Sequence, residues 1–229
     1  MELELRASPM LKISQLDVSI GSVAILRGVN LELPTGVMAG LIGRNGAGKT
    51  TLMRSVMGLL KPRAGRVEFD DANLGHVPPH RRAHAGIGYM PEDRRLIPEL
   101  TVEENIMAPA WAVGSRDGRE RLKKIYAMIP ELEPFAPRKA LQLSGGQQKL
   151  AALGRALMCG SKLLLLDEPF EGVAPVLAQR IAEVVAALKN EGLSVIVSES
   201  DLQHSTRMLD TVFRIERGEV TQMSSTKAI

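Results

Sequence analysis

The segment GRNGAGKT, residues 43–50, constrains the fold of this chain more than any other feature of its sequence. It lies between the apolar run GVMAGLIG and a stretch whose apolar residues recur with the period of a helix. Its glycines allow successive backbone N–H groups to point inward at phosphate oxygens, and the start of the helix adds a partial positive charge. A strand, a phosphate-binding loop and a helix in this order predict an α/β fold.

The expected nucleotide-binding residues form one continuous run. They are Gly43, Arg44, Asn45, Gly46, Ala47, Gly48, Lys49, Thr50 and Thr51. We expect the Lys49 ammonium to reach the β- and γ-phosphates of a nucleotide and the Thr50 hydroxyl to ligate Mg²⁺.

The segment LLLLDEP, residues 163–169, supplies the complementary acidic groups. An apolar strand ending in two acids places Asp167 at the carboxyl edge of the sheet, where the phosphate loop also lies. Asp167 would hold Mg²⁺, through a water molecule, and Glu168 would polarise the attacking water as general base. The two motifs together predict a nucleoside triphosphatase of the P-loop class.

The order of periodic segments predicts a single domain over residues 1–229 with a mostly parallel sheet. The first third is rich in strands and predicts an antiparallel β subdomain, whereas residues 93–160 predict an inserted helical subdomain that opens with Thr101 as N-cap. The last third alternates buried strands with helices, as in a parallel sheet covered on both faces. The expected strands are 11–20, 29–34, 36–43, 64–69, 85–90, 162–167, 193–198 and the hairpin 211–220; the expected helices are 46–60, 101–111, 119–129, 174–192 and 202–210.

Composition excludes several classes of protein. The net charge of +3 is too small to indicate a nucleic-acid partner. The single cysteine, Cys159, excludes a disulfide framework and is expected to be a small buried apolar residue. The start MELELRASPM lacks the apolar core of a secretory signal, and no apolar run approaches the length of a membrane span.

The segment LSGGQQK, residues 143–149, places two glycines directly ahead of an apolar helical stretch. Ser144 fits an N-cap, and the glycine amides would be unobstructed at the helix start. Together with GRNGAGKT and LLLLDEP, this signature resembles the ATP-binding subunits of ABC transporters, over nearly the whole chain. The resemblance implies that Ser144, Gly145, Gly146 and Gln147 bind the γ-phosphate of ATP held by the phosphate loop of a second subunit.

Other positions depart from the pattern of that family. Glu92 stands where the family usually has a glutamine that contacts Mg²⁺ and the attacking water, and a carboxylate can still coordinate metal or orient water. Ser200 stands in place of a histidine that touches the γ-phosphate. Ile20 replaces the aromatic residue that stacks on adenine, so the base would receive only an apolar contact. His204 is expected to be a surface helix residue and not a substitute for the missing histidine.

Several details resemble the ATP-binding subunits of branched-chain amino-acid and polar-amide importers, in particular YMPEDRRLIPELTVEENI, DEPFEGVAP and VIVSESD. This resemblance implies a peripheral subunit on the cytoplasmic face of the membrane, paired with a second ATPase subunit. It would work with a transmembrane permease and, indirectly, a substrate-binding protein. We expect Leu96, Ile97 and Pro98 to flank the groove that receives the permease. Trp111 could contact the permease or pack within the helical insert.

Alternatives stay open at this stage. The PEDRR run is also similar to monosaccharide importers, and Glu92 with Ser200 would suit a subunit that binds ATP as a clamp and hydrolyses it slowly or not at all. A chromosome-maintenance ATPase would have a long coiled coil between Lys49 and Ser144, where this chain has only 94 residues. A translation factor would carry two cassettes in tandem, and an exporter would usually carry fused membrane spans. The sequence has one cassette and no such span, so neither of these classes is expected.

Overall fold

The computed structural model describes residues 9–223. The expected absence of a secretory signal concerns the start of the chain, and residues 1–8 lie outside the described part. In the described part, none of the helices has both the length and the apolar character that crossing a bilayer requires.

The N-terminal region forms an antiparallel sheet of four strands in the order β2-β1-β4-β5. The strands are β1 (Leu11–Ile20), β2 (Val23–Leu33), β4 (Ala64–Phe69) and β5 (Ala72–Asn73). The alternation along residues 11–20 predicted β1 correctly, since its inward residues are buried in turn. Strand β2 begins six residues before the expected start at residue 29, because residues 23–26 continue the pairing with β1.

The central sheet has six strands in the order β10-β9-β3-β8-β7-β6, and all neighbours are parallel except β9 and β10. The strands are β3 (Met38–Ile42), β6 (Ile87–Met90), β7 (Leu163–Asp167), β8 (Ser194–Glu199), β9 (Thr211–Glu216) and β10 (Glu219–Met223). The carboxyl ends of β3, β6, β7 and β8 therefore meet at one edge, which is where ligands bind in such sheets. The mixed α/β class with an antiparallel N-terminal sheet is confirmed.

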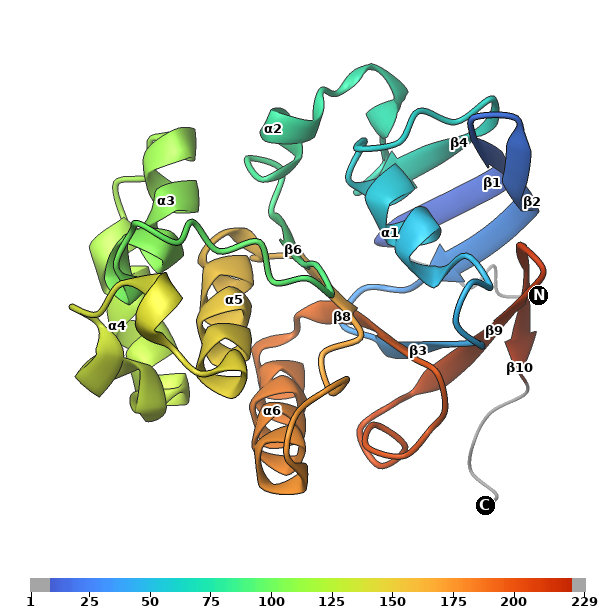
Figure 1. Cartoon of the computed structure of the whole chain (residues 1–229). Coiled ribbons are helices and arrows are strands. Elements are labelled where there is room, and N and C mark those ends of the chain that lie inside the picture. The colour runs from blue at the N-terminus through green and yellow to red at the C-terminus, as the bar shows by residue number, and fades with distance from the viewer. Residues whose placement is uncertain (1–8, 224–229) are drawn as a thin grey trace, which may run out of the picture.

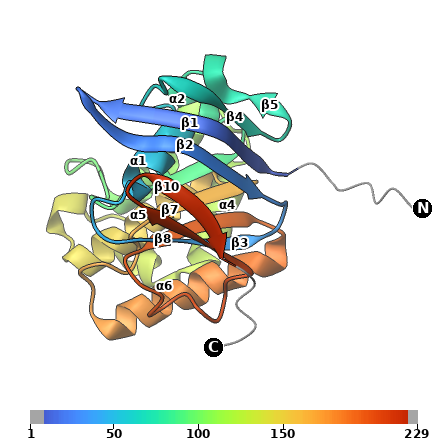
Figure 2. The same ribbon diagram turned by 90° about the vertical axis from the view of Figure 1, so that its right-hand side faces the viewer.

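Helices pack on the central sheet, and a group of them forms one end of the molecule (Figure 1). The helices are α1 (Lys49–Val56), α2 (Pro79–Arg82), α3 (Val102–Val113), α4 (Gly118–Met128), α5 (Gly145–Cys159) and α6 (Pro175–Ala187), with 3₁₀ turns at Leu74–His76, Pro130–Phe135, Ala140–Gln142 and Leu188–Glu191. Figure 1 shows α3, α4 and α5 gathered at the end of the molecule opposite the N-terminal sheet. In Figure 2 the N-terminal sheet and α6 lie on opposite sides of the central sheet. The helices of the expected insert thus lie together, while its boundaries at 93 and 160 stay a prediction.

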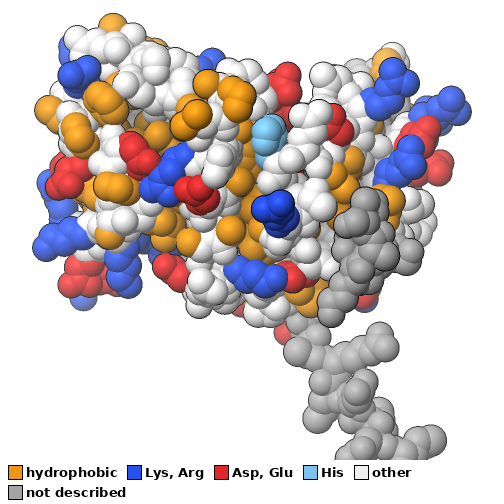
Figure 3. All heavy atoms as spheres, turned by 90° about the horizontal axis from the view of Figure 1, so that it is seen from below, with side chains coloured by type: hydrophobic (Ala, Val, Ile, Leu, Met, Phe, Trp, Pro, Cys, Tyr) orange, Lys and Arg blue, Asp and Glu red, His pale blue; other side chains and the backbone are white. Residues whose placement is uncertain are grey.

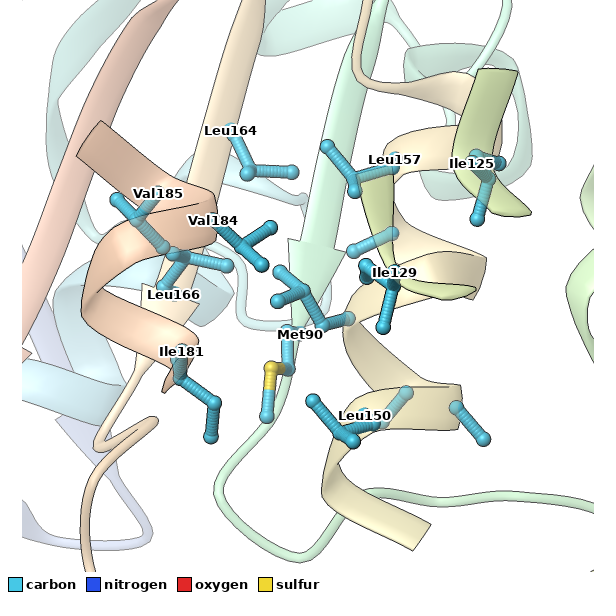
Figure 4. Packing of buried hydrophobic residues seen from close by; sticks show 14 of the residues in the cluster. Met90, Ile125, Ile129, Leu150, Leu157, Leu164, Leu166, Ile181, Val184 and Val185 are labelled. Atoms are coloured by element: carbon cyan, nitrogen blue, oxygen red, sulfur yellow. The ribbon is translucent and has the colours of Figure 1, made fainter. Parts of the chain in front are cut away.

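Two apolar clusters hold these layers together. One fills the space between the two sheets and includes Leu52, Met53 and Val56 of α1. The other packs the central sheet against α5 and α6 and continues into α3 and α4; Figure 4 shows its residues converging on Met90. Helix α1, which follows the phosphate loop, is therefore packed between the two sheets, and this packing fixes its N-terminus relative to the strand ends.

The surface seen in Figure 3 mixes acidic and basic side chains with hydrophobic ones. This face carries no broad area of a single charge, in keeping with the small net charge of +3.

Local signals predicted several helix boundaries correctly. Thr101 caps α3 in a reciprocal capping box with Glu104, and Gly192 ends the helical segment after α6 in the left-handed conformation. The expected helix at 202–210 is wrong, because this segment forms bends and turns instead. Its backbone follows tertiary contacts, including a hydrogen bond from the His204 N–H to the Glu199 carboxylate and packing of the His204 ring on Phe170.

Candidate functional site

The phosphate loop connects β3 to α1 and depends on its glycines. Gly46 and Gly48 have φ angles of +82° and +116°, which only glycine adopts without strain. A Cβ on Gly43 would lie 2.3 Å from the carbonyl oxygen of Ile215, so this position also excludes a side chain. The α1 helix begins without a side-chain cap, which leaves its first amides to serve an anion.

Lys49 begins α1 and is only 4% exposed. Its ammonium forms an ion pair with Glu168, with 2.9 Å between Nζ and Oε1, and donates to the carbonyl oxygens of Gly43 and Arg44. A buried ion pair is stable only when further hydrogen bonds satisfy its groups, and the loop carbonyls do this for Lys49. The structure therefore brings the phosphate loop and the LLLLDEP motif into direct contact, as the sequence predicted.

Asp167 ends β7 and is fully buried. It accepts hydrogen bonds from the hydroxyls of Thr50 at 3.2 Å, Ser198 at 2.9 Å and Tyr89 at 3.3 Å. Burial raises the pKa of Asp167, and these three hydroxyls oppose the shift by stabilising the carboxylate. Thr50 and Asp167 thus place two oxygen groups side by side at the edge of the sheet, where they could hold a metal ion.

Tyr89 and Ser198 take part in this network, although neither belongs to a sequence motif that predicts it. Each lies near the end of a strand adjacent to β7, and the register pairs Asp167 with Ser198. Burial and the charge of Asp167 raise the pKa of Tyr89, which keeps its hydroxyl protonated as a donor. They could have been predicted from their positions near the ends of the two strands that flank β7, the strand that ends in Asp167.

Glu168 follows β7 in a constrained backbone conformation. Its φ is +49°, in the left-handed region, and its N–H donates to the Ser198 hydroxyl at 3.0 Å. The residue is 8% exposed, and its carboxylate lies beside the phosphate loop through the pair with Lys49. A strained backbone persists only where surrounding contacts determine it, and such strain gathers at functional sites.

Ser200 and Glu92 also lie at this edge of the sheet. The Ser200 hydroxyl donates to Asn45 Oδ1 at 2.9 Å and lies 3.5 Å from Glu168 Oε1. Glu92 is exposed on the loop after β6; partial burial and the nearby charges of Asp167 and Glu168 raise its pKa. Ser200 and Asn45 border an open cleft of about 640 Å³ that extends along the phosphate loop.

The signature residues lie elsewhere. Ser144 caps α5 in a reciprocal capping box with Gln147, at 3.3 Å and 2.9 Å. A Cβ on Gly145 would lie 3.1 Å from the Arg94 guanidinium and one on Gly146 would lie 2.4 Å from a Leu177 methyl group, so a side chain at either position would require these neighbours to shift. Within residues 9–223, no hydrogen bond joins these four residues to the phosphate loop, and Figure 1 shows α5 and α1 well apart.

The remaining predicted positions lie mostly on the surface. Ile20 is 50% exposed, Ile97 46% and Trp111 55%, so Trp111 is not a core residue of the helical region. Leu96 packs partly against the helical core. Cys159 is only partly buried, and burial raises the pKa of its thiol to about 11.

Comparison with known proteins gives this geometry a context. The model of the protein family described as "ABC transporter" matches residues 26–171. The high-affinity branched-chain amino acid transport ATP-binding protein BraG of Pseudomonas aeruginosa is 32% identical over 220 residues, which are 96% of this chain and 94% of that protein. The lipopolysaccharide export system ATP-binding protein LptB of Haemophilus influenzae is 32% identical over 204 residues, covering 88% of this chain and 85% of LptB.

A solved structure of similar fold carries reaction products. It is a dimeric ATP-binding cassette in a post-hydrolysis state bound to ADP and Pi, with a TM-score of 0.84 and 25% identity; the match covers 96% of this chain and all of that one. The LptB match also corrects one expectation: the lack of fused membrane spans does not argue against export, because a separate cassette of similar length bears an export name.

Proposed function

This chain belongs to the ABC transporter family of ATPases, and on that premise we propose that it hydrolyses ATP between itself and a second cassette to power a membrane permease. The observation that carries the proposal is the buried network of Lys49, Glu168, Asp167 and Thr50 beside a glycine-rich loop. No other group of residues in the described chain combines phosphate-binding amides with a base and a candidate metal site.

The phosphate loop would bind the triphosphate through the amides of residues 43–51 and the Lys49 ammonium. A γ-phosphate is a stronger anionic partner than a single carboxylate, so it would draw Lys49 away from Glu168. Glu168 would then be free to accept a proton from the attacking water. Asp167 stays in place because three hydroxyls hold its carboxylate.

Mg²⁺ fits the residues present. It prefers oxygen ligands and usually binds through one or two protein groups plus substrate phosphates and water. Thr50 and Asp167 supply such a pair, and the described chain has no cluster of three or more acidic, histidine or cysteine ligands that would form a cage. When bound, the ion would neutralise charge on the β- and γ-phosphates.

Glu92 and Ser200 would act at the edge of the reaction centre. Ser200 can donate a hydrogen bond toward a γ-phosphate from its place beside Asn45, although it cannot supply a positive charge. Glu92 lies among like charges, since burial and then the charges of Asp167 and Glu168 raise its pKa. Either oxygen of Glu92 could orient water or complete the Mg²⁺ shell.

A second cassette would complete the site with its own signature. Ser144, Gly145, Gly146 and Gln147 are exposed or partly exposed at the start of α5 and contact each other instead of this chain's phosphate loop. Two chains facing head to tail would bring each signature to the other's ATP, and the dimeric form of a related cassette supports this arrangement.

The transported solute and the direction of transport rest on the relatives. We favour uptake of branched-chain amino acids or related small polar solutes, with a substrate-binding protein outside the membrane, because BraG matches almost end to end. A monosaccharide importer is the alternative from the PEDRR run, and lipopolysaccharide export is a second alternative from the LptB match. In each case the chain would lie at the cytoplasmic face, with Leu96, Ile97 and Pro98 flanking the permease groove.

The decisive test is ATP turnover by the complete complex purified through a tag on this chain. Replacing the base, Glu168→Gln, should lower kcat about 10²- to 10⁴-fold. The matched control is Glu171→Gln, which changes an exposed acid of the same turn and should keep kcat within about 3-fold. Unchanged turnover in Glu168→Gln would remove this residue as the base and support an ATP-clamp subunit. Dependence of turnover on an amino acid, a sugar or a lipopolysaccharide would then identify the substrate class.

A further inference from the structure

Lys149, the last residue of LSGGQQK, is a buried cation that the roles assigned so far leave unexplained. It is 4% exposed, and its ammonium donates to the carbonyl oxygen of Glu168 at 2.8 Å and to that of Glu171. Burial, assisted by the charge of Arg94, lowers the pKa of Lys149 to about 8, while Glu171, Glu168 and Glu92 oppose the shift. Burying an ammonium costs free energy unless it is hydrogen-bonded, so the two carbonyl acceptors are what allow Lys149 to be buried here.

The two acceptors of Lys149 lie in the turn that carries the candidate base. Glu168 has its backbone in the left-handed region at φ +49°, a conformation that costs free energy for a residue with a side chain. Its N–H donates to Ser198, and its carbonyl accepts from the Glu171 N–H within the turn and from Lys149 across to α5. Ser198 also donates to Asp167, so the strand side of this turn is tied to the candidate metal site.

We propose that Lys149 is a positioning residue for the general base: it fixes the Glu168–Glu171 turn to the signature helix, so that the direction of the Glu168 carboxylate follows the position of α5. This inference rests on the proposed ATPase function. In the proposed mechanism Lys149 contacts neither the nucleotide nor the attacking water, and it acts only through the backbone of Glu168.

The placement of Lys149 gives the contact a second consequence. It lies five residues after Ser144 on α5, roughly 7.5 Å along the helix axis. The signature end of α5 would contact ATP held by the partner, whereas Lys149 holds the base that acts on this chain's own ATP. Movement of α5 as the signature engages would therefore reach Glu168 through one side chain, which links the two sites of the dimer.

The test compares Lys149→Met with Gln148→Met in the complete complex. Lys149→Met keeps an apolar stem of similar length but removes the donor; we expect kcat to fall 10- to 100-fold, the effect of a misplaced catalytic group. The dissociation constant for ATP should stay within about 2-fold, because the phosphate loop is unchanged. Gln148→Met is matched, since Gln148 also donates to two carbonyls, of Ala140 and Leu143, but not to the catalytic turn. It should keep kcat within about 3-fold.

Conservative replacement separates positioning from simple packing. Lys149→Arg retains N–H donors and should recover at least a third of wild-type kcat, whereas a packing role would be disturbed by the larger side chain. If Lys149→Met does not fold, Lys149→Gln replaces it: its uncharged amide ends one bond short of the lysine ammonium, so kcat should lie at least 3-fold below wild type with unchanged ATP affinity. An active wild type with unchanged kcat in the Met or Gln variant overturns the inference, as does a parallel loss of kcat and ATP affinity. An inactive wild type overturns the proposed function itself.

Discussion

The phosphate loop and the signature motif both place glycines ahead of a helix, but their side chains find partners in different ways. Lys49 and Thr50, at the start of α1, bind Glu168 and Asp167 more than a hundred residues further along the chain. Ser144 and Gln147, at the start of α5, bind each other. The first helix start is completed by distant parts of the same chain, whereas the second presents its amides to the surface.

This difference follows from burial. Lys49, Asp167 and Glu168 are each less than 9% exposed, and charges in such surroundings must be paired or hydrogen-bonded. Ser144 and Gly145 are exposed and Gln147 is partly exposed, so water and a local capping box can satisfy their hydrogen-bonding groups. We therefore expect changes in the first region to affect both folding and nucleotide binding, and changes in the second to affect turnover alone.

The largest effect should come from Lys49→Met. It removes the cation that would bind the phosphates, so ATP turnover should fall about 10³-fold or more and ATP affinity should weaken. It also leaves the buried Glu168 carboxylate unpaired, at a cost of about 3 kcal/mol in the free energy of unfolding. Turnover of the complex, ATP titration and thermal unfolding measure the three effects.

A double variant sharpens this result. Adding Glu168→Gln to Lys49→Met removes the unpaired charge and should restore most of the lost thermal stability without restoring turnover. If Lys49→Met is as stable as the wild type, the buried ion pair is not important for the fold and the contrast between the two regions fails.

The next effect should come from Ser144→Arg, in the signature. A bulky cation at the cap would block the approach of the partner's ATP, so turnover should fall about 10²-fold. ATP binding by the isolated chain should remain within about 2-fold, because Ser144 makes no contact with the phosphate loop. Ser144→Thr keeps the cap oxygen and serves as the control, with activity close to wild type. Loss of ATP binding by the isolated Ser144→Arg chain would show that the signature acts on the chain's own nucleotide.

Sequence motifs predicted those parts of the site whose chemistry is local. The phosphate loop, the Asp167–Glu168 pair and the Ser144 cap each depend on residues close together in the chain. They lie where expected, between β3 and α1, at the end of β7 and at the start of α5, while their roles stay predictions. Tyr89, Ser198 and Lys149 escaped notice because their partners lie on neighbouring strands or on a turn two elements away. Only the strand register and the packing of α5 on β7 bring them together.

The wrong helix at 202–210 has the same origin. Its residues have adequate helical periodicity, but the buried Glu199 carboxylate and the ring of Phe170 bind the segment through His204. Tertiary contacts of this kind outweigh local propensity over a stretch of nine residues, which is too short for a stable isolated helix.

The narrowest effect is expected from Glu199→Gln, in the pH dependence of stability. It tests the part of the phosphate-loop region where a buried carboxyl lacks a hydrogen bond. Glu199 is 5% exposed, and Oε1 accepts no hydrogen bond from residues 9–223. Burial, and then the charges of Asp201 and Glu168, raise its pKa to about 7. Because this carboxyl has a higher pKa when folded than when unfolded, the stability it contributes is full in acid and is lost as pH rises through 7.

Glu199→Gln removes that ionisation. The variant should therefore exceed the wild type in unfolding free energy at pH 8.5, by at most about 3 kcal/mol, and lose this advantage by pH 5. Chemical denaturation of both proteins at these two pH values measures the difference. A constant difference across this range would mean that Glu199 ionises as an ordinary carboxylate despite its burial. The Glu199 carboxylate would then be stabilised when buried, as those of Asp167 and Glu168 are. The phosphate-loop region would differ from the signature by one more stabilised buried charge.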